Sequence, residues 1–195
     1  MDLRPGIFSL SLGHANVHHL PHKLKLAQQH GFQGVELSYN DLAAYSNDDR
    51  FEDDVFTVAR HISEMCDEFN LDIICLRSFE HYEALVDCNE KYADLNRKLL
   101  IWLRVSFILF AETILVPSNF LPDTGGKKTV MSSREVGVSD LKILAEKGEQ
   151  AWNELKQEAA QSPVMGRKRL PPTMLKFALM KQPLGAHTSM HGKTP

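Results

Sequence analysis

Short apolar segments alternate with longer helical segments along most of the chain. Residues 7–12 alternate apolar and polar positions with the two-residue period of a β-strand. Further apolar segments of strand length follow at 34–37, 71–76, 113–116 and 174–178. The segment 71–76 is almost continuously apolar, which predicts a strand that is buried on both faces.

Four helices are predicted between these strands. The first begins at Pro21 and ends before Gly31, a residue type that favours the left-handed conformation after a helix. Residues 53–69 place apolar side chains at every third or fourth position, on one face. A long helix follows over 89–110, and Ser139 is the expected N-cap of the fourth, after a polar loop. This alternation favours parallel strands joined by right-handed helical crossovers.

Composition excludes several classes of protein. A hydrophobic content of 43% is typical of a globular domain, and a net charge of −3 gives no reason to expect nucleic acid or a membrane as partner. The most apolar segment, 99–110, is shorter than the roughly 20 residues that span a bilayer, and Arg104 interrupts it. Because Cys66, Cys75 and Cys88 lack a metal-binding spacing, we expect free thiols in a cytoplasmic protein.

Four groups of residues together resemble one enzyme family. They are SLSLG at 9–13, HLPHKL at 19–24 with GFQGVEL at 31–37, FEHYEAL at 79–85, and VPSNFLP at 116–122. These segments resemble the fungal 3-dehydroshikimate dehydratases, within the xylose isomerase-like barrels of the sugar phosphate isomerase/epimerase group. The resemblance covers roughly residues 5 to 178, and GFQGVEL and VPSNFLP are its most specific parts.

The resemblance implies both a fold and an activity. The fold is α/β: a partial (β/α)₈ TIM barrel comprising the first four to five βα units, over 1–178, with an irregular C-terminal tail. At 195 residues the chain is shorter than the about 250 of a complete barrel. The implied activity is a metal-dependent lyase that converts 3-dehydroshikimate to protocatechuate in quinate catabolism. A divalent cation (Mg, Mn or Co) polarises the substrate carbonyl in such enzymes while a base removes a proton.

The chain departs from the family after Ala178. The family places its first metal ligand and its base in a Tyr-Glu-Ala-x-x-Trp-Gly-x-His run at the fifth strand, and residues 179–195 do not contain this run. With suitable synonymous codons, a reading frame shifted by two nucleotides yields Tyr-Glu-Ala-Ala-Ala-Trp-Gly-Thr-His. We interpret 179–195 as a non-homologous, frameshifted tail. We therefore assign no catalytic and no metal-binding residue, and expect this chain to bind no metal and to be inactive.

Substrate-binding residues are expected where the strands end, because barrel active sites form at that edge. Glu36 ends the second strand, although a salt-bridged acid at the rim is the alternative. Glu83 follows the third strand, and the alternative for it is a solvated loop acid. Ser118 follows the fourth strand, where turn formation is an equally good explanation. Four histidines lie in the first βα loop and its helix without the spacing of a zinc site, and His14 is the one expected near the pocket.

Two alternatives stay open. The chain can be a sugar phosphate isomerase or epimerase, because one fold supports many chemistries. It can also be a truncated remnant without enzymatic activity. The expected partner is a small molecule, either 3-dehydroshikimate or a sugar-like polyol. A barrel that does not close leaves strand edges unpaired, so the chain can also form a homo-oligomer through them.

Overall fold

Five parallel strands form one sheet in a computed structural model that describes residues 4–46, 55–85, 89–119, 121, 123, 125–126, 129–130, 133–161 and 175–180. The strands are β1 (Gly6–Phe8), β2 (Gly34–Ser38), β3 (Asp72–Arg77), β4 (Thr113–Pro117) and β5 (Lys176–Met180). They pair in sequence order, β1-β2-β3-β4-β5, and every pairing is parallel. The predicted architecture of parallel strands with helical crossovers is therefore confirmed.

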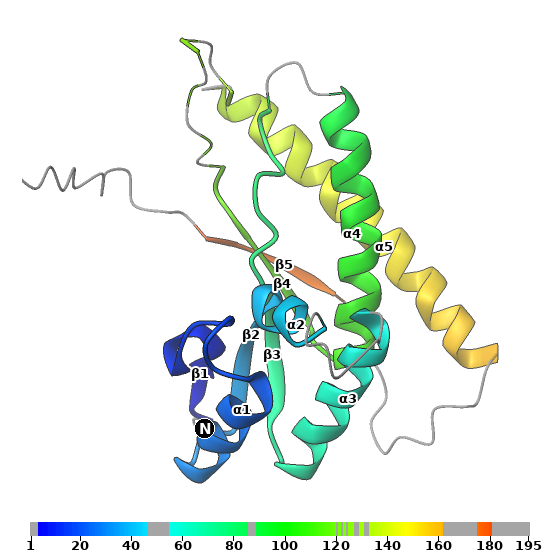
Figure 1. Ribbon diagram of the computed structural model, residues 1–195. Coiled ribbons are helices and arrows are strands. Elements are labelled where there is room, and N and C mark those ends of the chain that lie inside the picture. The colour runs from blue at the N-terminus through cyan, green and yellow to red at the C-terminus, as the bar shows by residue number, and fades with distance from the viewer. Residues whose placement is uncertain are drawn as a thin grey trace, which may run out of the picture.

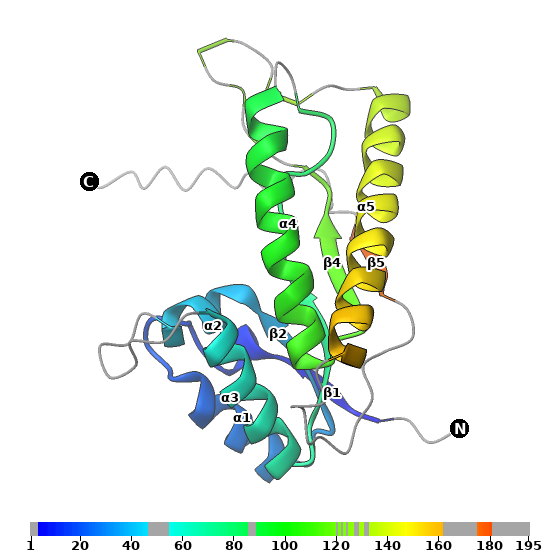
Figure 2. The same ribbon diagram turned by 90° about the vertical axis from the view of Figure 1, so that its right-hand side faces the viewer.

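Helices connect the strands and pack on one face of the sheet (Figures 1 and 2). They are the short 3₁₀ helix η1 (Ser9–Leu12), α1 (Leu20–Gln29), α2 (Tyr39–Ser46), α3 (Val55–Glu68), α4 (Asn89–Leu109) and α5 (Arg134–Gln161). The core lies between this layer and the sheet. Leu37 and Val116 from the strands are fully buried there against Leu24, Ile62 and Leu103 from the helices.

The start of the chain differs from the prediction. The strand expected over 7–12 ends at Phe8, and Ser9–Leu12 form a 3₁₀ helix instead. The cause is a side-chain contact, because the Ser9 hydroxyl accepts a hydrogen bond from the backbone N–H of Ser38 at 2.9 Å. Ser9 thus occupies the position beside β2 that a continuing strand would have taken.

Two further predictions are corrected, and one observed helix was not expected. The helix α2 was not predicted, and α5 begins at Arg134 rather than after Ser139. Ser133 provides the earlier start, because its hydroxyl accepts a hydrogen bond from the N–H of Val136 at 3.4 Å. In β3, Ile74 is 46% exposed, so this strand is not buried on both faces. Ile74 lies on the sheet face opposite the helices.

Two predicted details are confirmed within the described residues, the end of α1 and the free thiols. Gly31 follows α1 with a φ of 78°, as expected for a helix stop, and Cys66 and Cys75 are free thiols. No described helix is long and apolar enough to cross a membrane. The strand β5 continues to Met180, two residues beyond the predicted domain boundary, and 181–195 lie outside the described residues. The division after Ala178 stays a prediction.

Candidate functional site

An ion pair joins the middle of β2 to the carboxyl end of β3. Glu36 was expected to end the second strand, but β2 runs two residues further, to Ser38. The Glu36 carboxylate on β2 lies 2.8 Å from the Arg77 guanidinium on β3. The β2–β3 register shifts between Val35 and Glu36, so that Glu36 lies opposite Cys75 rather than Ile74. An irregularity of this kind redirects the side chains that follow it. The shift therefore decides which β3 side chains share a face with Glu36.

A third strand contributes an aromatic ring to this pair. The guanidinium carbon of Arg77 lies 4.0 Å from the centroid of the Phe8 ring at the end of β1, within the range of a cation–π interaction. The Arg77 side chain is 18% exposed and the Glu36 side chain 39%. Arg77 is thus held by two contacts, and the Glu36 carboxylate is still accessible to a small molecule.

The same cluster affects the thiol of Cys75. The pKa of Cys75 is raised to about 11, mainly by burial and in addition by the negative charge of Glu36. The positive charge of Arg77 and a backbone hydrogen bond with Leu115 act in the opposite direction. The neutral thiol is the stable form beside this ion pair, which argues against Cys75 as a nucleophile near neutral pH.

Alkylation of Cys75 by iodoacetamide is expected to be slow below about pH 10, because only the thiolate reacts and it is the minor form there. The Glu36→Gln variant removes a negative charge and leaves Arg77 in place, so the pKa should fall and alkylation should begin at lower pH. Peptide mass spectrometry across a pH series measures the rate at Cys75, and Cys75→Ser is the control. An unchanged midpoint in Glu36→Gln would show that the carboxylate does not act on the thiol.

Glu83 connects the loop after β3 to the loop after β4. Its Oε1 accepts a hydrogen bond from the backbone N–H of Asn119 at 2.6 Å, and its backbone carbonyl accepts one from Asn119 Nδ2 at 2.8 Å. The Asn119 Oδ1 in turn lies 3.2 Å from Nδ1 of His81. Glu83 Oε2 is buried and has no hydrogen-bond partner among the described residues. The observed contacts of Glu83 are structural, and its role in substrate binding stays a prediction.

The other two predicted residues lie at the rim. Ser118 directly follows β4 and is exposed. His14 is also exposed, in the loop after η1, where it lines a pocket of about 390 Å³ with Asn16 and Asn40. Glu36 is not among the residues that line this pocket. The roles of His14 and Ser118 in substrate binding stay predictions.

A buried ion pair below this rim was missed by the sequence analysis. Nζ of Lys23 on α1 lies 2.6 Å from the Asp41 carboxylate on α2, and it also donates to the Gly13 carbonyl at 2.6 Å. Both side chains are completely buried. One feature of the sequence could have indicated the pair: Lys23 lies on the same face of α1 as Leu20, Leu24 and Ala27, which are buried. This pair fixes the loop that carries His14 against α2.

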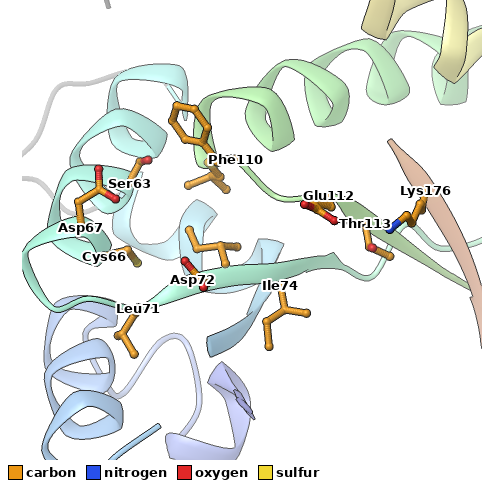
Figure 3. Close-up of a pocket in the computed structure, with 12 residues that line it drawn as sticks. Ser63, Cys66, Asp67, Leu71, Asp72, Ile74, Phe110, Glu112, Thr113 and Lys176 are labelled. Carbon is orange, nitrogen blue, oxygen red and sulfur yellow. Dashed lines mark ion pairs between the residues drawn. The ribbon is translucent and has the colours of Figure 1, made fainter. Parts of the chain in front are cut away.

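The pocket in Figure 3 lies at the opposite end of the strands. It measures about 520 Å³, and its lining includes Asp72, Thr113 and Lys176, the first residues of β3, β4 and β5. Glu112 and Lys176 form an exposed ion pair of 3.5 Å beside it (Figure 3). Residues at this end of a barrel usually serve stability, whereas activity belongs to the carboxyl end. The Glu36–Arg77 cluster is therefore the better candidate site.

A divalent cation needs several carboxylate or imidazole ligands close together. Among the described residues, no group of three or more His, Cys, Asp or Glu side chains could hold a metal ion. The described part of the chain therefore does not fit the metal that the resemblance implies.

Comparisons with known proteins agree with the resemblance and the fold. No protein-family profile matches the chain. The chain is 35% identical over 161 residues to 3-dehydroshikimate dehydratase of Neurospora crassa, covering 77% of this chain and 44% of that relative. Among solved structures, the chain is similar to a xylose isomerase-like TIM barrel/4-hydroxyphenylpyruvate dioxygenase fusion protein, with a TM-score of 0.62 and 21% identity. The match covers 78% of this chain and 21% of the fusion protein. The chain is also similar to the IolI protein with a bound zinc atom, with a TM-score of 0.60 and 14% identity. This match covers 92% of this chain and 51% of the IolI chain.

Proposed function

Since this chain has the fold of the xylose isomerase-like TIM barrels and is related in sequence to a 3-dehydroshikimate dehydratase, we propose that it carries the substrate-binding part of such a site. The ligand is a hydroxylated ring acid of the 3-dehydroshikimate kind. The chain spans less than half the length of that relative, so its activity and substrate are proposals. The observation that supports binding is the Glu36–Arg77 ion pair between β2 and the carboxyl end of β3.

The Glu36–Arg77 pair is chemically suited to bind the hydroxyl groups of a ligand. An ionised carboxylate accepts hydrogen bonds from hydroxyls, and charge-assisted bonds of this type are stronger than neutral ones. Arg77 fixes Glu36 before the ligand arrives, which reduces the entropy lost on binding. Glu83, Ser118 and His14 are proposed to border the ligand at the rim of the site.

We propose that this chain alone binds the ligand but does not catalyse its conversion. The described residues do not fit a divalent metal, so no dehydration step is derived from them. We further propose a cytoplasmic location, because the thiols of Cys66 and Cys75 are free and buried, as is usual in a reducing compartment.

The Glu36→Gln variant tests the binding proposal. It is expected to weaken binding of 3-dehydroshikimate by about 10-fold or more, because a hydrogen bond to a charged group is lost and Arg77 loses its partner. Isothermal titration calorimetry measures the affinity, and Glu80→Gln in the loop after β3 is the matched control. Equal affinity of Glu36→Gln and the natural chain would contradict the role of Glu36.

Absorbance of protocatechuate, recorded with Mg²⁺, Mn²⁺ and Co²⁺ in turn, tests the absence of turnover. Product formation by the purified chain would overturn this part of the proposal. The alternative, a sugar phosphate isomerase or epimerase, predicts that a ketose phosphate binds more tightly than 3-dehydroshikimate in the same titration. A remnant without function predicts that neither ligand binds.

A further inference from the structure

The cavity in Figure 3 exists because two neighbouring strands begin at different levels of the sheet. The strands β3 and β4 pair at Leu76 and Ile114, which lie near the end of β3 but near the start of β4. The first residues of β3 therefore extend beyond β4. The cavity of about 520 Å³ lies beside them, next to the ends of α3 and α4 (Figure 3). Small-molecule sites typically measure about 300–1,000 Å³, so this cavity can hold a small organic molecule.

The inner wall of the cavity is apolar. Leu71, Ile73 and Leu109 belong to the buried core and also line the cavity. The lining includes Phe110, which directly follows α4 and has a φ of 57°. This conformation usually belongs to glycine after a helix and is rare for a bulky residue. It places an aromatic side chain at the cavity where the usual glycine would provide none.

The rim of the cavity carries more negative than positive charge. Among the residues that the structure describes there, Asp67, Asp72 and Glu112 provide three carboxylates and Lys176 one ammonium group (Figure 3). Asp72 is paired with Arg4, and Glu112 with Lys176 at 3.5 Å. Arg4, Glu112 and Lys176 are each more than half exposed, so these pairs are weak. An excess of negative charge is left even when Arg4 is counted.

We propose that this cavity binds an organic cation with an aromatic body, of the amidine or aryl amine class. The aromatic body packs on Leu71, Leu109 and the Phe110 ring, and the cationic group faces the carboxylates of the rim. A charge attracts its partner more strongly beside an apolar wall than in bulk water. The site lies at the opposite end of the strands from the Glu36–Arg77 pair, so it does not rest on the proposed function.

Three probes of similar shape and different charge test this site: benzamidine, benzamide and benzoate at pH 7. Nuclear magnetic resonance titration of the purified chain measures the affinity of each probe and locates it through the backbone amides that shift. Benzamidine is expected to bind with a Kd of about 1 mM or below, and to shift amides at the starts of β3 and β4. Benzamide should bind about 10-fold more weakly, and benzoate more weakly still, because the rim attracts only a cation.

The Phe110→Gly variant tests the apolar wall, because glycine suits the backbone conformation at this position. It should stay folded by circular dichroism and bind benzamidine about 10-fold more weakly. The Glu112→Gln variant removes a rim carboxylate and leaves Lys176 to repel the probe, so it should weaken benzamidine about 10-fold and leave benzamide unchanged. The matched control is Glu146→Gln at an exposed position on α5, which should bind like the natural chain.

Several results would overturn the proposal. They are equal affinity for the three probes, no binding of benzamidine at about 10 mM, or shifted amides only at another part of the chain. Unchanged affinity in a folded Phe110→Gly variant, or an equal loss in Glu112→Gln and Glu146→Gln, would also overturn it. If Phe110→Gly does not fold, the comparison of Glu112→Gln with Glu146→Gln decides. Binding of 3-dehydroshikimate is measured separately, so failure of the proposed function leaves these results unaffected.

Discussion

Replacing Lys23 by methionine is expected to lower the free energy of unfolding by about 3–5 kcal/mol, because Asp41 would stay buried without its cation. Lys23 and Asp41 are completely buried and 2.6 Å apart, so water cannot replace the missing charge. The Gly13 carbonyl would lose its donor as well. Methionine has a similar length and no charge, so the loss reflects the ion pair more than a cavity. Urea denaturation followed by circular dichroism measures the change.

The double variant Lys23→Met with Asp41→Asn is the control. It removes the uncompensated carboxylate, so it should recover much of the lost stability. A loss below about 1 kcal/mol in Lys23→Met would be typical of a solvated surface pair and would contradict the buried geometry. Lys25, which is exposed on the same helix, provides a comparison in Lys25→Met, where little change is expected.

Replacing Trp102 by alanine is expected to cost about 3–5 kcal/mol of stability, the usual cost of a large aromatic deletion in a core. Its ring on α4 stacks on Tyr39 of α2 at 4.5 Å and meets the edge of Phe79, in the loop after β3, at 5.3 Å. Trp102 thus joins three segments that are separate in the sequence. Thermal and urea unfolding measure the loss, and the fluorescence of Trp152 follows the transition in the variant.

The Trp102→Phe variant distinguishes aromatic packing from the indole N–H. Nε1 of Trp102 is buried without a hydrogen-bond partner among the described residues, which carries a desolvation cost. Phenylalanine keeps most of the stacking area and removes this donor, so its loss should be clearly smaller than that of alanine. Equal losses in the two variants would show that the ring contacts with Tyr39 and Phe79 contribute little.

Local patterns predicted the elements whose burial follows a simple period. The helix expected over 53–69 is observed as Val55–Glu68, and the strand expected over 113–116 as Thr113–Pro117. Apolar spacing is set by the face that each element buries, so it can be read without knowing the neighbour. Ile74 shows the limit of such patterns, because apolarity predicts burial but cannot tell whether another element covers that face.

The candidate site was predicted only in part. Glu36 was expected at the end of the second strand but lies in the middle of β2. Its partner Arg77 lies 41 positions further along the chain, and a register shift decides that the two meet. His14 and Ser118 lie in the loops after η1 and β4, and no periodic signal indicates what they contact. Glu83 was expected at the substrate, and its observed partner Asn119 belongs to another loop.

The sequence by itself determined the order of the five strands and of the four longer helices between them, and the relationship to a dehydratase, because these depend on local spacing and residue identity. Only the tertiary structure decided which charges meet. Lys23 with Asp41, and Glu36 with Arg77, are contacts between separate elements. A charge is buried only where a distant partner offsets the cost of its desolvation, and strand register and helix packing create that partner.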